Sequence, residues 1–301
     1  MLNVWIDTDI GDDIDDAVAL LVAARHPQLR LVGVSTVYGP VMARAWLAGE
    51  LLRCLGSKAP VFPGAAMPLR GSESSLQATS YLRLVPPDVF STPPGEDGAA
   101  ISVVAEAMLA LAEPFHLVTI GAMTNAARLI RDHPEVRKRW LGVTCMGGRL
   151  EEDPEYNVWC DHEAAAIVFR ETAPRVVGLE ASSHTLPRAE VEALVSPTAP
   201  PSGPRGVLSG SQRGSGAFLL DCYREYREYR AHREDPPLTL YDPITVLSLA
   251  HPEAFDFQSL RVLVEGEGRL RLTDDGYQVQ YALSSDWPRL KPVVADLLGK
   301  A

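Results

Sequence analysis

The most constraining stretch of the chain is residues 3–24, where a short apolar run, an aspartate-rich loop and a helical pattern follow one another. Residues 4–6 (VWI) are typical of a buried strand, and apolar side chains spaced three and four apart from Ile14 to Ala24 predict a helix. Pro27 requires that helix to end before it. The aspartates therefore lie at the carboxyl end of a strand, which is where ligands bind in open α/β sheets.

The loop carries six aspartates within the ten residues 7–16. Two carboxylates about 5 Å apart repel by roughly 3 kcal/mol at an effective dielectric near 20, so such a loop faces solvent, takes up protons or surrounds a cation. Because a strand fixes Asp7 and Asp9 at its end, we favour a cation site built from oxygen ligands. The alternative is an acidic surface loop in which Asp15 and Asp16 favour a helix N-terminus.

The available ligand atoms indicate which ion to expect. The stretch offers carboxylate, hydroxyl and carbonyl oxygens but neither His nor Cys, whereas zinc prefers nitrogen and sulfur. Calcium or magnesium is the better match. An EF-hand loop does not fit, since Gly11 is at the fifth place counted from Asp7 and Val18 stands where a bidentate Glu is needed.

The motif Asp7-Thr8-Asp9-x-Gly11, followed by Asp15-Asp16-Ala17, resembles the N-terminal signature of the inosine–uridine-preferring nucleoside hydrolases, usually DxDPGxDDA. The chain differs from it by Ile10 in place of the proline and by two additional residues before the Asp pair. The same DxD start resembles haloacid-dehalogenase-type phosphatases, but those have Thr or Val where this chain has Gly11.

Further motifs that resemble this family follow in the right order after predicted strands. Residues 121–125 match its G-x-x-T-N turn, and the resemblance implies that Thr124 gives a main-chain carbonyl to calcium. On its own, Thr124 would be a helix N-cap. Residues 146–148 match M-G-G, which implies that Met146 lines the sugar pocket.

Two later motifs complete the resemblance. Glu155 and Asn157 match an E-F-N motif whose Glu and Asn hold ribose hydroxyls, with Tyr156 in place of the Phe. Tyr241 and Asp242 stand where the family usually has H-D-P, so Asp242 matches a calcium ligand and Tyr241 replaces a His near the nucleobase. Without the family, Glu155 would be a solvated loop residue and Asp242 an N-cap.

Two departures fall on the sugar-binding half of the pattern. Many relatives have Gly-Asn where this chain has Gly39-Pro40, and the shortened loop from Gly148 to Glu155 lacks an additional Asn. The metal half is therefore better matched than the sugar and base half.

Strands and helices alternate along most of the chain, which predicts an α/β fold with a mostly parallel central sheet flanked by helices. Alternating residues over 257–283, with glycines at the turns, predict antiparallel hairpins near the C-terminus. We expect one domain over residues 1–301. Besides the first strand, the expected strands are 29–37, 60–62, 115–120, 141–146 and 175–179. Besides the first helix, the expected helices are 43–55, 99–111, one starting near 124, 163–171, two long stretches after 179, and 287–298.

Composition narrows the class of partner. The net charge of −11 argues against a nucleic-acid partner, and no apolar run is long enough to span a membrane. The N-terminus lacks the pattern of a signal peptide, and the four cysteines have no metal-like spacing, so we expect reduced thiols in the cytoplasm.

Residues 196–215 are expected to form a surface loop. Tyr223, Tyr226 and Tyr229 share one face of a predicted helix, where a core or interface position is the common outcome and stacking on a nucleobase the alternative.

The resemblance implies a calcium-dependent hydrolase that splits a ribonucleoside into free base and ribose and that forms a homodimer or homotetramer. Because calcium polarises water less than zinc does, a carboxylate must take the proton, and Asp9 is the candidate base. The metal ligands would be Asp9, Asp16, Thr124 and Asp242 with Asp7 in support, and the substrate-binding residues Asp15, Met146, Glu155, Asn157 and Tyr241.

Three questions stay open at this point. The chain could instead be a magnesium-dependent phosphatase with Asp7 as a covalent nucleophile, or a calcium-stabilised sugar-binding protein without turnover. The two additional residues leave open whether Asp13 replaces Asp15 or Asp16 in the site. The preferred nucleobase does not follow from the sequence.

Overall fold

A computed structural model of the chain describes residues 1–70, 82–90, 96–195, 215–230 and 237–299. Eleven named strands form two sheets within these residues. The strands of the large sheet are β1 (Leu2–Thr8), β2 (Leu29–Thr36), β3 (Val61–Pro63), β4 (Phe115–Thr119), β5 (Trp140–Met146), β6 (Arg175–Val177), β9 (Phe255–Val264), β10 (Leu270–Leu272) and β11 (Tyr277–Ser285). The small sheet pairs β7 (Thr185–Leu186) with β8 (Leu238–Thr239).

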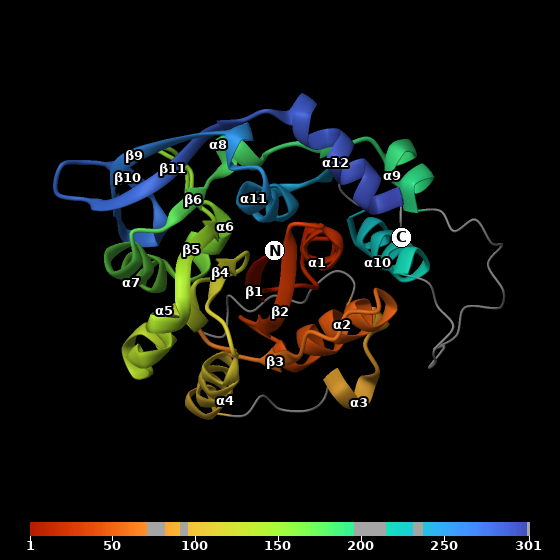
Figure 1. The fold of residues 1–301 in the computed structure, drawn as a ribbon, viewed down its shortest axis with the longest axis horizontal. Helices are drawn as coiled ribbons and strands as arrows, with labels where there is room; N and C mark the ends of the chain where they lie inside the picture. Colours follow the sequence, from red (N-terminus) through yellow and green to blue (C-terminus); the bar gives the residue numbers. More distant parts are fainter. Residues whose placement is uncertain (71–81, 91–95, 196–214, 231–236, 300–301) are drawn as a thin grey trace.

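The large sheet has the order β10-β9-β11-β6-β5-β4-β1-β2-β3. In Figure 1 it runs from the blue β9 and β11 through the green β5 and β6 to the red β1 and the orange-red β2. From β11 to β3 all neighbouring strands pair in parallel, whereas β9 pairs antiparallel with both β10 and β11. This arrangement confirms the expected mostly parallel sheet with antiparallel strands near the C-terminus.

The helices follow the expected pattern with two corrections. Leu179 does not extend a strand but begins a short helix, because β6 ends at Val177. Only one of the two long helices expected after residue 179 is long, since α9 has eight residues and α10 sixteen. The α-helices are α1 (Asp15–Arg25), α2 (Val41–Cys54), α3 (Pro87–Phe90), α4 (Asp97–Ala110), α5 (Thr124–Asp132), α6 (Tyr156–Cys160), α7 (His162–Thr172), α8 (Leu179–Ser182), α9 (Arg188–Val195), α10 (Ser215–Arg230), α11 (Tyr241–Ala250) and α12 (Trp287–Gly299).

The core has two parts, one on each face of the sheet. Successive side chains of a strand point to opposite faces, and in β1 Val4 and Ile6 pack with α1, α2 and α11 while Trp5 packs with α4, α5 and α7. Figure 1 shows these two groups of helices on opposite sides of the sheet. Burial of each such side chain stabilises the fold by about 1.5–3 kcal/mol. Strand β1 is therefore held on both faces, and its carboxyl end is a rigid support for the residues that follow.

The tyrosines of α10 divide between core and surface. Tyr223 and Tyr226 are 2% and 5% exposed and belong to the core, whereas Tyr229 is 44% exposed. The core interpretation therefore holds for two of the three. The loop expected at 196–215 lies, apart from its last residue, outside the described residues.

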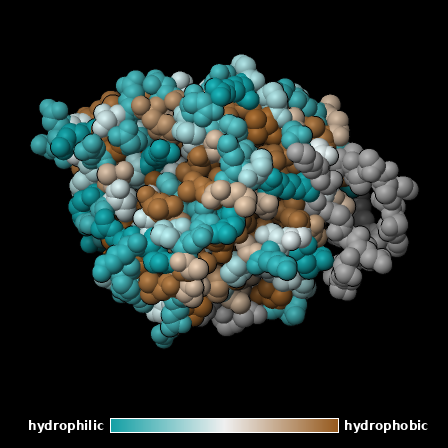
Figure 2. All heavy atoms as spheres, in the orientation of Figure 1, coloured by the Kyte–Doolittle hydropathy of each residue, from teal (hydrophilic) through white to brown (hydrophobic). Residues whose placement is uncertain are grey.

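Polar and apolar side chains are interspersed on the face of the molecule seen in Figure 2. None of the helices in the described ranges is long and apolar enough to cross a membrane. Cys54, Cys145, Cys160 and Cys222 are all free thiols.

Candidate active site

The structure brings together three carboxylates from two helices. Asp15 and Asp16 lie in the first turn of α1, and Asp242 lies in the first turn of α11. One carboxylate oxygen of each lies within 4.8 Å of the other two, and all three side chains are buried. Helices α1 and α11 lie side by side in Figure 1, and a hydrogen bond joins their first turns. Helix N-termini carry partial positive charge, which stabilises acidic groups placed there.

The suggestion that Asp242 is an N-cap is wrong. Leu240 is the N-cap of α11 and makes no side-chain cap, so Asp242 is already inside the helix. Its backbone N–H donates to Oδ2 of Asp15 at 3.1 Å. The carboxylate of Asp242 is therefore available to a ligand shared with α1.

Burial dominates the electrostatics of this group. It raises the pKa of Asp15, of Asp16 and of Asp242 well above the usual value for a carboxyl group, and the negative charges of neighbouring aspartates raise all three further. The hydroxyl of Thr8 opposes this at Asp16 by donating to its Oδ1. Keeping all three ionised in one place requires a compensating cation.

Asp7 and Asp9 lie at the end of β1, and neither belongs to the group of three carboxylates. Asp9 is 5% exposed, and a Cβ atom added at Gly121 would lie 2.8 Å from its Oδ1, so only glycine leaves room for this carboxylate. Oδ1 of Asp7 accepts hydrogen bonds from Ser35 and, at 2.7 Å, from Nδ2 of Asn125. Oδ2 of Asp7 is buried and has no hydrogen-bond partner among the described residues.

Burial also raises the pKa of both strand-end carboxyl groups. The pKa of Asp7 rises to about 7, against the opposing hydrogen bonds from Ser35 and Asn125. The pKa of Asp9 rises to about 7 as well, with the positive charge of Arg44 opposing the rise. Both groups would hold their negative charge more readily beside a cation.

These donors fit a hard divalent cation. The converging atoms are carboxylate oxygens of three buried aspartates. No His or Cys belongs to the group of three carboxylates. Oxygen-only sites suit calcium or magnesium better than zinc.

Thr124 begins α5 rather than capping it. Met123 is the N-cap residue of this helix, so the proposed capping role of Thr124 is wrong. The Thr124 hydroxyl instead donates to Oδ2 of Asp161 at 2.6 Å. Asp161 in turn caps α7 by accepting from the N–H of Ala164 at 3.0 Å. Thr124 is therefore fully buried and held in place beside the ends of β4 and β5.

Glu155 is buried and structured, not a solvated loop residue. It caps α6, and its carboxylate accepts from the N–H groups of Gly148, Asn157 and Val158 at 2.9, 2.8 and 3.2 Å. Gly148 has a φ of +88°, and a Cβ atom added to it would lie 2.2 Å from the Leu270 side chain. This position therefore requires glycine.

Asn157 and Met146 lie against each other at the carboxyl ends of β4 and β5. Nδ2 of Asn157 donates to the carbonyl of Ile120 at 3.1 Å and lies 3.2 Å from Sδ of Met146. Tyr241 is half-buried, and burial raises its pKa, with the negative charges of Asp15 and others adding to the rise. These side chains thus lie on the side of the sheet where the aspartates are.

The structure shows which aspartates of the loop belong to the group of three carboxylates. Oδ1 of Asp13 accepts from the N–H of Ile14 at 2.9 Å, and Asp13 does not belong to the group of three carboxylates. Asp12 pairs with Arg44 at 2.9 Å. The helix-borne Asp15 and Asp16 are thus the pair at the site.

Arg44 was not expected from the sequence. It lies on α2, is 1% exposed and contacts the backbone of the aspartate loop. The one available signal was a lone arginine next to the buried Ala43 and Leu47 in an otherwise apolar helix face.

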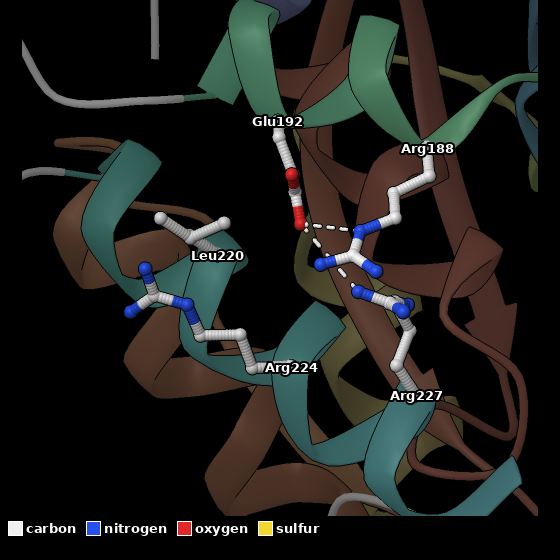
Figure 3. A pocket seen from close by; sticks show the side chains of 5 residues that line it. All are labelled: Arg188, Glu192, Leu220, Arg224 and Arg227. Atoms are coloured by element: carbon white, nitrogen blue, oxygen red, sulfur yellow. Dashed lines mark hydrogen bonds and ion pairs between the residues drawn. The ribbon is translucent and has the colours of Figure 1, made fainter. Parts of the chain in front are cut away.

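A separate hollow of about 300 Å³ lies between α9 and α10. Figure 3 shows Glu192 within it, paired with Arg188 at 2.9 Å and with Arg227 at 3.5 Å. None of the carboxylates described above lines it; the lining residues are Arg188, Glu192, Leu220, Arg224 and Arg227.

Fold and site together define an α/β protein with a group of buried carboxylates at the starts of two helices, α1 and α11. Residues 4–291 match the family described as "Inosine-uridine preferring nucleoside hydrolase". The chain therefore belongs to this family and is an N-glycosyl hydrolase. The phosphatase and the non-enzymatic sugar-binding protein are thereby set aside.

Individual relatives agree with the family. The chain is 26% identical to a "Probable uridine nucleosidase 1" of Oryza sativa subsp. japonica, over 96% of this chain and 89% of the relative. It is 28% identical to a "Pyrimidine-specific ribonucleoside hydrolase RihA" of Salmonella enteritidis, over 89% of this chain and 86% of the relative.

Solved structures share the fold. A plant nucleoside hydrolase, the PpNRh1 enzyme, superposes with a TM-score of 0.75 at 22% identity and covers 99% of this chain and 98% of its own. The inosine-uridine preferring nucleoside hydrolase of Bacillus anthracis gives a TM-score of 0.73 at 18% identity, with both chains fully covered.

Proposed function

We propose that this protein is a calcium-dependent ribonucleoside hydrolase that releases a free base and ribose. The observation that carries the proposal is the group of Asp15, Asp16 and Asp242, whose oxygens converge within 4.8 Å in a buried site. The ion would be held by side-chain oxygens and one carbonyl, with Asp7 in support. These ligands would be Asp9, Asp16, Thr124 through its carbonyl, and Asp242.

The chain's own carboxylates would do the proton chemistry. When bound, calcium supplies positive charge that offsets the carboxylates and favours ionisation of a water molecule. Asp9 would accept the proton of the water that attacks the anomeric carbon: burial raises the pKa of its carboxyl group, and the neighbouring ion would oppose this rise and keep the group ionised as a base.

Ribose recognition would fall to Asp15, Glu155 and Asn157, which would bind its hydroxyl groups. As the C–N bond lengthens, positive charge grows on the sugar ring, the electronic problem that glycosidases share. Fixed negative groups beside the ring stabilise that charge without having to reorganise. Met146 would line the sugar pocket and Tyr241 would lie near the leaving base.

We also propose that residues 1–301 form one domain, supported by a large sheet that contains strands from both ends of the chain. The resemblance supports a homodimer or homotetramer. The four free thiols support a location in the cytoplasm. The net charge of −11 supports an uncharged nucleoside rather than a nucleic acid as partner.

The test compares two chromogenic substrates with and without metal. The purified protein is treated with a chelator, then assayed on p-nitrophenyl riboside and on p-nitrophenyl phosphate with calcium or magnesium added back. We expect calcium-restored turnover of the riboside only. Turnover of the phosphate ester, or riboside hydrolysis that the chelator does not reduce, would contradict the proposal.

A further inference from the structure

Arg44 is a buried cation that binds the aspartate loop by its backbone. Its Nε donates to the carbonyl of Tyr38 at 2.7 Å, and one terminal nitrogen donates to the carbonyls of Asp9 and, at 3.1 Å, Ile10. The other terminal nitrogen binds Oδ2 of Asp12 at 2.9 Å. One guanidinium thus joins the loop after β1 to the loop after β2.

This contact set requires arginine. Its planar fork presents five N–H donors in fixed directions, whereas lysine has one flexible ammonium group. Removing a guanidinium from water is costly unless its donors are satisfied, and here two loops and one carboxylate satisfy them. The geometry is therefore specific to Arg44 and not a generic positive charge.

Arg44 contacts Asp9, the residue at which the aspartate loop begins. Asp9 would act both as a metal ligand and as the base. Arg44 holds the carbonyl of Asp9, and the Asp9 carboxylate lies beside Gly121. The loop from Asp9 to Ile14 contains the two additional residues, and a longer irregular loop loses more conformational entropy when it is ordered. Arg44 offsets this by binding three successive parts of the loop, at residues 9, 10 and 12.

The charge of Arg44 also stabilises the folded aspartate loop. The guanidinium lies within electrostatic range of the carboxylates of Asp9, Asp12 and Asp16. A divalent ion alone leaves several of the buried negative charges uncompensated, and the arginine adds one permanent positive charge next to them.

We propose that Arg44 is a positioning residue for metal binding: by holding the Asp9–Asp12 loop backbone, it orders the lengthened loop so that the Asp9 carboxylate faces the Asp16 and Asp242 carboxylates. The inference rests on the proposed metal site. It concerns the architecture of this chain, because it assigns a compensating contact to the two-residue insertion.

The test measures calcium affinity directly by isothermal titration calorimetry, independently of activity. In Arg44→Met the affinity is expected to fall about 10- to 100-fold, the usual effect of losing a group that orients metal ligands. Arg44→Lys is expected to restore only part of it. Arg53→Met is the matched control, because Arg53 lies on the same helix, is 41% exposed and pairs with Glu50 away from the site; its affinity should equal that of the wild type.

Hydrogen exchange gives a second readout. Amides of residues 9–13 are expected to exchange faster in Arg44→Met, while those of β4 and α7 stay protected. If that variant does not fold, Asp12→Asn serves instead: it keeps the carbonyl contacts and removes the charged partner, and it should weaken calcium several-fold.

The outcomes separate the two proposals. Wild-type calcium affinity and unchanged exchange in folded Arg44→Met, or in Asp12→Asn where that variant replaces it, would overturn the positioning role and leave the proposed function standing. A wild-type protein that binds no calcium would overturn both.

Discussion

The backbone N–H of Asp242 donates to Oδ2 of Asp15 at 3.1 Å, although 227 positions separate the two residues in the chain. This hydrogen bond joins the first turns of α11 and α1 and sets the spacing between the carboxylates that they carry. Because Asp242 makes the contact through its backbone, both carboxylates keep oxygens that can face a shared ion. The site is thus fixed by helix placement rather than by the flexible loop alone.

The first prediction separates the aspartates of the loop. Asp16→Asn removes a carboxylate from the group of three, so calcium affinity and kcat/KM on p-nitrophenyl riboside should each fall by more than about 100-fold, beyond the effect of losing an orienting neighbour. Asp13→Asn is the control, since Asp13 lies outside that group, and it should change either quantity less than about threefold. Equal losses in the two variants would show that the assignment of the pair is wrong.

The second prediction concerns stability on metal removal. A ligand that binds only the folded state at 100 times its Kd adds about 2.7 kcal/mol to the free energy of unfolding. For a chain of this size that is a rise in Tm of roughly 4 °C. We expect this rise on adding calcium to chelator-treated protein, measured by calorimetry at constant ionic strength.

The same experiment has an internal control. Asp16→Asn removes one of three mutually repelling buried charges, so the metal-free variant should melt at a higher temperature than the metal-free wild type. Its Tm should not respond to calcium. A wild-type Tm that calcium leaves unchanged would contradict a calcium site at these residues.

Local sequence pattern predicted the scaffold of the site well. The apolar run of β1, the helical spacing of α1 and the glycine-containing turns after β4 and β5 are all encoded by neighbouring residues. They placed Asp9, Asp15 and Asp16 at the carboxyl end of the sheet. Recognition of short motifs then added Asp242 and Thr124, which no periodicity could connect to the loop.

The supporting contacts could not be predicted in this way. Arg44 reaches the carbonyl of Asp9 across 35 positions, and Asn125 reaches Asp7 across 118. Both depend on how helices pack on the sheet, to which the local pattern gives no access. The capping assignments for Thr124 and Asp242 failed for a related reason: each helix begins one or two residues earlier than its polar side chain suggested.

The third prediction concerns acid stability and involves His116, far from the candidate ligands. Burial, with the positive charge of Arg175 adding to it, lowers the pKa of His116 in β4 from 6.5 to about 4. The unfolded chain takes up this proton near pH 6.5, and the folded protein only near pH 4. The part of the free energy of unfolding that depends on neutral His116 is therefore fully present above pH 6.5. It falls by up to about 3 kcal/mol as the pH is lowered toward 4.

His116→Gln isolates this effect, because glutamine does not titrate and can keep the hydrogen bond to Oγ1 of Thr144, 2.9 Å away in the wild type. Urea unfolding of both proteins at pH 7 and at pH 4.5 gives the difference. We expect the wild type to lose more free energy of unfolding than the variant over this range. Parallel losses in both proteins would contradict the assignment.

The last prediction uses Tyr241, which stands where the family motif usually has histidine. Burial, with nearby negative charges adding to it, raises the pKa of the Tyr241 phenol, so it stays protonated throughout the neutral range. Histidine at this position would instead titrate near pH 6.5. The wild-type profile of kcat/KM against pH should therefore lack a limb that depends on residue 241 near neutrality.

Two variants test this directly. Tyr241→His should introduce an additional limb that depends on residue 241, with an apparent pKa near 6.5. Tyr241→Phe should leave the shape of the profile near neutrality unchanged, because neither side chain titrates there, whether the phenol donates a proton or only stacks. If the wild type has a limb near 6.5 that disappears in Tyr241→Phe, the phenol itself titrates in this range, and the environment assigned to Tyr241 is wrong.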